Sequence, residues 1–228
     1  METSTCRRQV TADADECEVL VADTPGLLDE VFRLRYQVYC LEKGFEPGCN
    51  NKEIDEFDSR AGHVLLVHRE SGEPIGTARV VPSGPSAGLH GLPMTSICAP
   101  GLMRHLPPLT TGEISRFAVS KQRRISCRAG MMVRLGLMQG ILRLSTTMGL
   151  THWCAIMEPT LLRLLQMSAI HFSPIGPLVN YHGLRQPACL NIDVALERGR
   201  IEQPEAWNYV TLAGTLWRRD QVQELLVA

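Results

Sequence analysis

The sequence has no long apolar run and no excess of charge of either sign. Its apolar stretches fall short of the ~18 residues that a membrane-spanning helix needs, so we expect no integral membrane segment. Lysine and arginine number 23 against 24 aspartates and glutamates, which leaves a formal net charge of −1. Nucleic-acid-binding domains usually carry a basic face, so this balance argues against nucleic acid as a partner.

The sequence also lacks the cysteine patterns of metal sites. None of its eight cysteines stands in a C-x-x-C pair or beside histidines at zinc-ligand spacing, so we expect no metal and reduced, mostly buried thiols in a cytoplasmic protein. The N-terminal stretch has no apolar segment of the kind that signal peptides carry. The length suits one domain over 16–228, with a frayed segment at 1–15.

Strand and helix patterns alternate along the chain. Strands are predicted at 17–22, 63–70, 74–82, 113–120 and 151–157, with further strand candidates at 170–179 and 188–196. Helices are predicted at 24–43, 128–149, 158–169 and 219–226. An antiparallel hairpin followed by a βαβ unit predicts an α/β fold with a mixed, mostly antiparallel sheet and helices on both faces.

Charged residues interrupt the predicted core elements. Arg35 falls in the apolar stripe of the 24–43 helix, and Arg79 lies inside a strand. Buried charges need partners of opposite sign, and an acidic loop lies between these two arginines. We therefore expect a polar network that combines three arginines with four acids: Arg35, Arg79, Arg116, Glu53, Asp55, Asp58 and Glu113. Such networks mark candidate functional sites, although some are purely structural.

The stretch GEISRFAVSK, residues 112–121, is an unusual core strand because it carries an acid, a hydroxyl and an arginine. Simple alternation places its side chains on two faces. One face holds Glu113, Ser115, Phe117 and Val119, and the other holds Ile114, Arg116, Ala118 and Ser120. A β-bulge in this strand would re-aim these side chains.

These motifs resemble those of the acyl-homoserine-lactone synthases. The resemblance covers an arginine with two aromatics, an E-x-D-x-x-D motif, a strand arginine and an E-x-S-R motif. The matching residues are Arg35, Tyr39 and Phe45; Glu53, Asp55 and Asp58; Arg79; and Glu113, Ser115 and Arg116. Those synthases have tryptophan at the position of Phe45 and usually phenylalanine at the position of Tyr39.

The stretches RYQVYCLEKGFE, EISRFAVSK, MEPTLLRLL and IGPLVNYHGLRQP resemble a sister group more closely. This group is the exosortase-associated (PEP-CTERM system) acyltransferases of bacteria, which are similar to the N-acyl amino acid synthases. The resemblance spans roughly residues 30–190, and all these families belong to the GNAT acyltransferase superfamily. The GNAT fold agrees with the element order predicted above.

The resemblance implies an acyltransferase that moves a fatty acyl group from an acyl-phosphopantetheine thioester to the amine of an amino acid. The donor is acyl-carrier protein or acyl-CoA, used as a co-substrate, and no permanently bound cofactor is expected. Two alternatives stay open. One is an acyl-homoserine-lactone synthase using S-adenosylmethionine, and the other is a non-catalytic acyl-lipid sensor.

Site residues follow from the same resemblance. Glu113 is the expected base that accepts the amine proton, and Ser115 positions the substrate or protonates the leaving thiolate. The expected substrate-binding residues are Arg35, Tyr39, Phe45, Glu53, Asp55, Asp58, Arg116, Phe117, Ala118 and Val119. In the resembled superfamily a bulge in this strand supplies a backbone N–H donor, here near 117–119, that would bind the oxyanion. Arg123, Arg124 and Arg128 are expected to bind the phosphopantetheine phosphate or an acidic carrier protein, with Cys127 at a position where GNAT enzymes have glycine.

Other reactive side chains are weaker candidates. His182, with Arg185 beside it, is a second candidate base, although a lone loop histidine is more often incidental. Cys40 or Cys127 as an acyl-bearing nucleophile lacks an adjacent histidine in the sequence, and direct transfer needs no such step.

Overall fold

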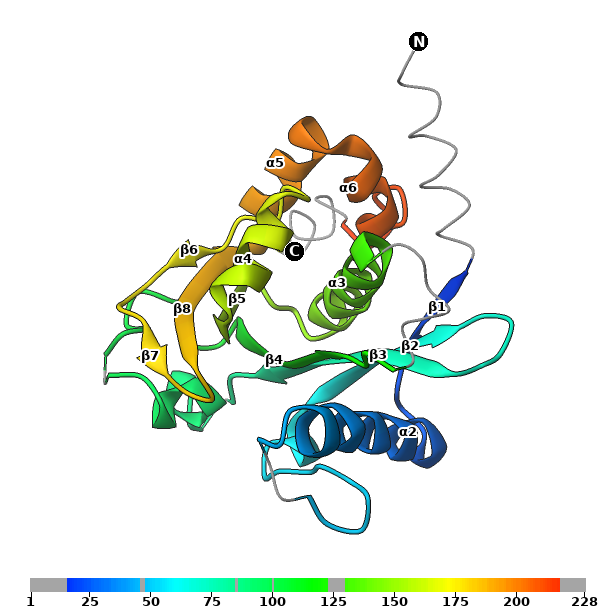
Figure 1. Cartoon of the computed structure of the whole chain (residues 1–228). Helices are drawn as coiled ribbons and strands as arrows, with labels where there is room; N and C mark the ends of the chain where they lie inside the picture. The colour runs from blue at the N-terminus through cyan, green and yellow to red at the C-terminus, as the bar shows by residue number, and fades with distance from the viewer. Residues whose placement is uncertain (1–15, 46–47, 85, 100, 123–129, 218–228) are drawn as a thin grey trace.

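The computed structural model describes residues 16–45, 48–84, 86–99, 101–122 and 130–217 (Figure 1). Several predictions from the sequence lie outside these ranges: the frayed segment 1–15, the three arginines and the cysteine of 123–128, and the helix at 219–226. Within the described ranges no helix combines the length and the apolar character that crossing a bilayer requires. The cysteines within these ranges are free thiols.

The sheet is mixed and mostly antiparallel, as the sequence predicts. Its order is β1-β2-β3-β4-β5-β8-β6, with β7 paired to β8. The pair β4–β5 is parallel and the other neighbours are antiparallel. The strands are β1 (Cys17–Val21), β2 (Gly62–His68), β3 (Pro74–Pro82), β4 (Thr111–Val119), β5 (His152–Met157), β6 (Ser173–Pro174), β7 (Val179–Asn180) and β8 (Leu184–Asn191).

Helices cover both faces of this sheet (Figure 1). Helix α2 (Pro25–Arg35) packs on one face, where Val31 and Leu34 meet Leu65 of β2. Helix α3 (Gly130–Thr147) packs on the other face and connects β4 to β5. The remaining helices are α4 (Pro159–Gln166), α5 (Ile192–Glu202), α6 (Pro204–Thr211) and the short turns η2 (Asp58–Arg60), η3 (Leu89–Gly91) and η4 (Pro93–Ser96).

The predicted 24–43 helix is correct in extent, but its second half is wound differently. Thr24 caps α2 by accepting the Leu27 N–H at 3.4 Å, and Pro25 occupies the first turn. From Tyr36 to Glu42 the chain continues as a π-helix, η1. Such wider turns often occur at functional sites. Tyr39 lies within η1.

The C-terminal third departs most from the sequence prediction. The strand predicted at 170–179 is wrong in most of its length, since only β6 and the first residue of β7 fall within it. The strand predicted at 188–196 is wrong in its second half, because Asn191 ends β8 and caps α5 by accepting the Val194 N–H. Residues 184–187, which lie between the two predicted strand candidates, form the first half of β8. Helices α5 and α6 were not predicted.

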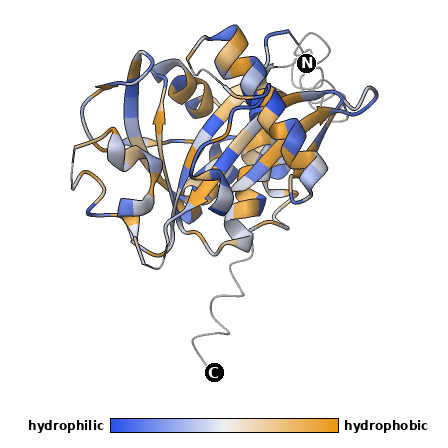
Figure 2. Cartoon of the chain, turned by 90° about the horizontal axis from the view of Figure 1, so that it is seen from below, coloured by the Kyte–Doolittle hydropathy of each residue, from blue (hydrophilic) through white to orange (hydrophobic). Residues whose placement is uncertain are grey.

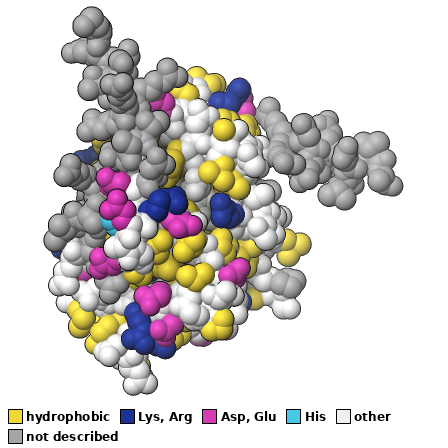
Figure 3. Space-filling view, turned by 90° about the vertical axis from the view of Figure 1, so that its right-hand side faces the viewer, with side chains coloured by type: hydrophobic (Ala, Val, Ile, Leu, Met, Phe, Trp, Pro, Cys, Tyr) yellow, Lys and Arg dark blue, Asp and Glu magenta, His cyan; other side chains and the backbone are white. Residues whose placement is uncertain are grey.

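Hydrophobic and hydrophilic residues both occur along the central strands (Figure 2). On the face drawn in Figure 3, acidic and basic side chains are interspersed among uncharged ones. Three charged residues of helix α2, β3 and β4 are nevertheless buried, and such residues need partners inside the fold. Arg35 and Arg79 have 0% exposure, and Glu113 has 3%.

Close packing of α3 on the sheet depends on glycine. A Cβ at Gly140 would overlap the side chain of Val64 on β2. We expect Gly140→Ala to lower the free energy of unfolding by about 1–3 kcal/mol, although alanine favours helix, because the sheet would have to shift. Chemical denaturation measures this change. Gly26→Ala in α2, where an added Cβ meets no atom within 4 Å, is the control and should not destabilise.

Candidate active site

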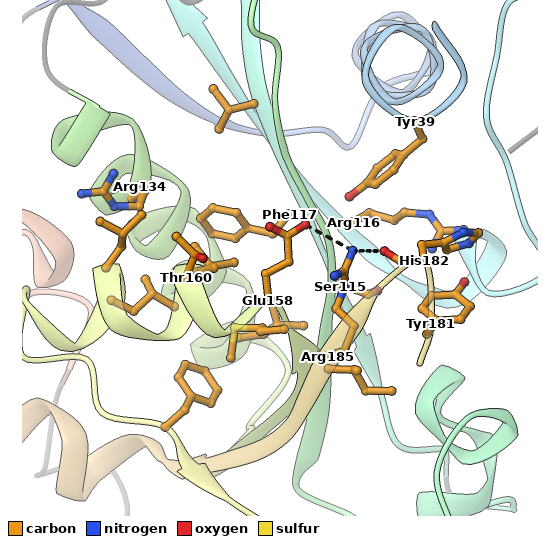
Figure 4. A pocket seen from close by; sticks show the side chains of 18 of the residues that line it. Tyr39, Ser115, Arg116, Phe117, Arg134, Glu158, Thr160, Tyr181, His182 and Arg185 are labelled. Atoms are coloured by element: carbon orange, nitrogen blue, oxygen red, sulfur yellow. Dashed lines mark hydrogen bonds and ion pairs between the residues drawn. The ribbon is translucent and has the colours of Figure 1, made fainter. Parts of the chain in front are cut away.

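A cavity opens where β4 and β5 separate. The two strands pair only from Thr111–Glu113 to His152–Cys154, and beyond this point the ladder between them ends. The cavity that fills the gap has a volume of about 400 Å³, within the range of ligand pockets. Its walls come from β4, β5, α3, α4 and the segments 39–45 and 181–185 (Figure 4).

A β-bulge in β4 sets which side chains face this cavity. Ser115 pairs with Arg79 and Ala118 pairs with Thr77, so Arg116 and Phe117 together stand opposite Ala78. Arg116 has a φ of 50°, which is rare for a residue other than glycine. The sequence resemblance anticipates a bulge in this strand.

The bulge makes the simple two-face assignment wrong after Ser115. Ser115 and Arg116 both join the polar network on the α2 side. Phe117 and Val119 instead pack with Ile114 in the core beneath α3. Ala118 lies with the core beneath α2. The extra residue shifts the alternation by one position, as a bulge requires.

The predicted arginine–acid network exists and centres on Arg35. Its guanidinium donates to Glu53 Oε2 at 2.5 Å and to both oxygens of Asp58 at 2.6 and 3.0 Å. Bidentate pairs of this kind are the strongest that arginine forms. Arg35 therefore ties α2 to the 53–58 loop through side chains that are almost completely buried.

Arg79 and Arg116 complete the network. Arg79 donates to Asp55, to Asp58 Oδ1 at 2.7 Å and to Ser115 Oγ at 3.0 Å. Arg116 donates to Glu53 Oε1 at 2.8 Å and to Asp55 Oδ2 at 3.0 Å. Three cations thus meet three carboxylates, and the network is electrically balanced without a ligand.

The pKa values agree with three ionised acids. Burial alone would raise the pKa of Glu53 and of Asp58, but the hydrogen bonds from the arginines outweigh it and hold both below their ordinary values. Burial would raise the pKa of Asp55 as well, but the hydrogen bond from Arg79 outweighs burial and holds this pKa below its ordinary value. For Tyr39, burial raises the pKa to about 12, so its hydroxyl stays protonated.

Glu113 lies beside the network but does not join it by a hydrogen bond. In the described part of the chain, its Oε2 accepts the backbone N–H of Met94 at 2.7 Å rather than a bond from Arg116. Burial raises its pKa to about 8, although Arg79 and Arg116 lie close enough to oppose the shift. A carboxyl poised near neutral pH on a cavity wall suits proton transfer.

The predicted site residues divide into three groups. Those that line the cavity are Tyr39, Phe45, Glu113, Ser115, Arg116, Phe117 and Val119. Those outside its lining are Arg35, Glu53, Asp55, Asp58 and Ala118. Asp55 and Asp58 also border a more open depression beside Phe32 and His63. Arg123, Arg124 and Arg128 lie outside the described residues.

One arm of the cavity is apolar. Helices α3 and α4 and the segment after α4 supply its side chains: Val133, Met138, Leu161, Leu164, Leu165 and Phe172. Met138 contributes both to the core and to the cavity wall.

The other arm is aromatic and charged, and three of its residues, Lys43, Glu158 and Tyr181, were not singled out from the sequence. His182 stacks on Phe45 with ring centroids 4.6 Å apart, and Tyr181 packs against His182. Arg185 Nη2 lies 3.2 Å from Glu158 Oε1, and Lys43 Nζ lies 3.4 Å from the same oxygen. These residues come from distant segments, so no local motif in the sequence links them.

The structure offers no support for a covalent cysteine step. Cys40 is absent from the cavity lining, and Cys127 lies outside the described residues. Among the described residues no group of histidine, cysteine or acidic side chains has the arrangement that could hold a metal ion.

The model of one protein family matches most of this chain. Its description is N-acyl amino acid synthase FeeM, and the match covers residues 30–192. No curated protein matches the sequence significantly.

Solved structures with the same fold include members of two enzyme groups. FeeM, an N-acyl amino acid synthase from uncultured soil microbes, is 19% identical with a TM-score of 0.61; the alignment covers 82% of this chain and 96% of FeeM. The acyl-homoserine-lactone synthase LasI is 20% identical with a TM-score of 0.60, covering 76% and 88%. BjaI, a CoA-dependent acyl-homoserine-lactone synthase, is 22% identical with a TM-score of 0.58, covering 87% and 99%.

Proposed function

Because this chain belongs to the N-acyl amino acid synthase FeeM family, it is an acyltransferase, and we propose that it joins a fatty acyl group to the α-amine of an amino acid. The observation that carries this proposal is the two-armed cavity at the fork of β4 and β5. Its apolar arm suits an acyl chain, and its polar arm holds a carboxyl poised to accept a proton.

In the proposed reaction the acyl chain lies in the apolar arm, and the thioester carbon lies beside β4. Backbone groups of β4 that point towards β5 beyond Glu113 have no strand partner in the described part of the chain, because the β4–β5 ladder ends there. Such N–H groups near 117–119 would hold the carbonyl oxygen as it gains negative charge.

Glu113 is the proposed base. The amine nitrogen attacks the thioester carbon, a C–N bond forms, and the C–S bond breaks. The proton lost by the amine passes to Glu113. The Ser115 hydroxyl is the proposed donor of a proton to the leaving thiolate, and it regains a proton from Glu113 through solvent. The raised pKa of Glu113 lets it both take and release a proton near neutral pH.

The arginine–acid network is proposed to shape the acceptor side rather than to contact the reacting atoms. Arg116 lies over the Tyr39 ring at 5.5 Å, so the network fixes a wall of the cavity. Arg35, Glu53, Asp55 and Asp58 hold Arg116 and the bulge in position from behind that wall. Preorganisation of this kind places a substrate amine near the base.

The donor and the setting are further proposals. We propose acyl-carrier protein as the donor, received by Arg123, Arg124 and Arg128, with no permanently bound cofactor and residues 16–228 acting as one GNAT-like domain in the cytoplasm. The resemblance of IGPLVNYHGLRQP to exosortase-associated acyltransferases supports a role in a PEP-CTERM system.

Mass spectrometry of organic extracts tests the proposed function. Cells that overproduce this chain should contain a series of N-acyl amino acids that is absent from an empty-vector control. The masses would identify both the amine and the acyl chain. Acyl-homoserine lactones would instead favour the S-adenosylmethionine-dependent alternative, and retention of acyl ligands without any new amide would favour a lipid sensor.

The apolar arm should set the acyl-chain length. Leu161→Phe narrows this arm, so we expect the enzyme to prefer shorter chains, with kcat/KM falling about fourfold for each methylene that loses its place. Competition between donors of different chain length measures this shift. Leu178→Phe, at an exposed site outside the cavity, is the control. An unchanged preference in Leu161→Phe would contradict the assignment of this arm.

A further inference from the structure

The two groups of charged side chains around the cavity differ in their balance. The arginine–acid network pairs three cations with three carboxylates. At the polar arm, by contrast, Lys43 and Arg185 share the single carboxylate of Glu158 among the residues that the structure describes. One positive charge is therefore left over beside a cavity, and this arrangement suits a ligand that carries one negative charge.

Arg185 is held rigidly enough to recognise such a ligand. Its Nη2 donates to the His182 carbonyl at 2.7 Å, and its Nη1 donates to the Leu184 carbonyl at 3.1 Å. Its side chain is only 13% exposed. The tight turn that offers the first carbonyl depends on left-handed backbone at His182 and Gly183, whose φ angles are 50° and 99°.

Lys43 is also placed by its neighbours. Its Nζ lies 5.3 Å from the Phe45 ring centroid and 5.9 Å from that of Tyr39, so two aromatic faces hold the ammonium group. The Phe45–His182 stack then joins this segment to the loop that carries Arg185. Both cations thus converge on one oxygen of Glu158 from opposite segments of the chain.

Figure 4 shows Glu158 and Arg185 meeting in the middle of the cavity. Tyr39, Arg116 and His182 lie to one side, and Thr160 and Arg134 lie to the other. Arg134 belongs to the first turns of α3. Arg185 therefore lies between the α3 side and the aromatic side of the cavity.

We propose that Arg185 and Lys43 bind the carboxylate of the amino acid acceptor, and that Glu158 holds the two cations in place until it arrives. This assignment rests on the proposed function and makes the acceptor an α-amino acid rather than a simple amine. The balanced network of Arg35, Arg79 and Arg116 leaves no comparable positive charge for that carboxylate.

A phosphate of the acyl donor is also an anion and could bind the same cations. The test therefore distinguishes the donor phosphate from the acceptor carboxylate. The purified enzyme is assayed with the amino acid identified from the product masses and with the amine that lacks its carboxylate. KM is measured for acceptor and donor in wild type and in Arg185→Gln. Ratios of variant to wild type for each acceptor cancel differences in the intrinsic reactivity of the two amines.

Arg185→Gln should raise KM for the amino acid about 10- to 100-fold, the loss typical of a charge-assisted bond. The donor KM and the kcat/KM for the amine without a carboxylate should stay unchanged. Lys43→Gln should act in the same direction, and Arg185→Lys should restore part of the affinity. Glu158→Gln, whose amide oxygen still accepts hydrogen bonds, should not raise the amino acid KM. Arg163→Gln, exposed on α4 and outside the cavity lining, is the charge-matched control.

Four results would overturn the assignment. A rise in the donor KM alone would place the donor phosphate at Arg185. Equal losses with both acceptors would make Arg185 a structural residue. If the wild type forms amides only with amines that lack a carboxylate, the acceptor is no amino acid, and the proposed function fails together with this assignment. If the Arg185→Gln enzyme forms N-acyl amino acids with an unchanged KM for the amino acid, the proposed function stands, but Arg185 does not bind the acceptor carboxylate.

Discussion

Replacing Arg35 by methionine is expected to lower the free energy of unfolding by about 3–5 kcal/mol, the loss typical of breaking a buried charge pair from one side. Methionine fills much of the space of the arginine stem but leaves Glu53 and Asp58 without their closest cation. Both carboxylates are buried, so water cannot replace the lost bonds without opening the structure.

Denaturant unfolding measures this loss, and Arg33→Met is the matched control. Arg33 lies two residues away in the same helix and pairs with Asp29, but its side chain is 50% exposed. Exposed pairs of this kind contribute at most about 1 kcal/mol. Equal and small losses in the two variants would show that the network does not stabilise the fold.

The deficit of Arg35→Met should depend on pH. In the wild type the pKa values of Glu53 and Asp58 lie below their ordinary values, because the arginine bonds outweigh burial. These groups therefore stabilise the fold above their ordinary pKa, and this stability is lost as pH falls and they take up protons. The difference in free energy of unfolding between wild type and Arg35→Met should therefore be largest near neutral pH and should shrink in acid.

Replacing Glu113 by glutamine is expected to lower kcat by about 100- to 10,000-fold with little effect on the fold. Glutamine has nearly the same shape, and its amide oxygen can still accept the Met94 N–H. It cannot take the amine proton. Steady-state kinetics at saturating donor and acceptor measure the effect, and the exposed Glu70→Gln in the β2–β3 turn is the control.

The pH dependence of the same variant identifies the base. Because burial raises the pKa of Glu113 to about 8, wild-type kcat should rise as pH increases through that value and Glu113 loses its proton. Glutamine should abolish this limb of the profile. A Glu113→Gln enzyme with native stability and unchanged kcat would remove Glu113 from the mechanism.

Stability should move in the opposite direction. The native state keeps the Glu113 proton up to about pH 8, whereas the unfolded chain loses it near its ordinary value of 4.5. Wild type therefore loses stability, relative to Glu113→Gln, as pH rises from 4.5 to 8. The variant should be the more stable protein at pH 8, which a thermal unfolding series across this range would show.

The sequence predicts the buried network because charge inside an apolar pattern demands a partner. Arg35 interrupts a helical stripe and Arg79 interrupts a strand, and the E-x-D-x-x-D loop lies between them. Their pairing follows from the cost of burying an unpaired charge, without knowledge of the fold. Glu113 was also expected in that network. Its carboxyl instead accepts a hydrogen bond from the backbone N–H of Met94.

The orientation of residues after Ser115 depends on three-dimensional structure. A bulge arises from the register between β3 and β4, and strict alternation in the sequence conceals it. Helix α5 was not predicted either. Asn191 ends β8 and caps α5, so no turn residues separate the strand from the helix. Tertiary packing decided both cases.

The polar arm of the cavity illustrates a further limit. Lys43 and Glu158 are 115 residues apart in the sequence. The fold brings together Lys43 at the end of η1, Glu158 at the start of α4 and Arg185 in β8. From the sequence, His182 is a second candidate base with Arg185 beside it. That histidine instead stacks on Phe45, while its carbonyl positions the arginine.

The most direct test of the central claim is the product formed by the purified enzyme. Acyl-carrier protein bearing a fatty acyl thioester would be incubated with a mixture of ¹⁵N-labelled amino acids and S-adenosylmethionine, and the products weighed by mass spectrometry. We expect an N-acyl amino acid that carries the label, with one free thiol released per amide formed. An acyl-homoserine lactone, or thiol release without any labelled amide, would contradict amino acid acylation.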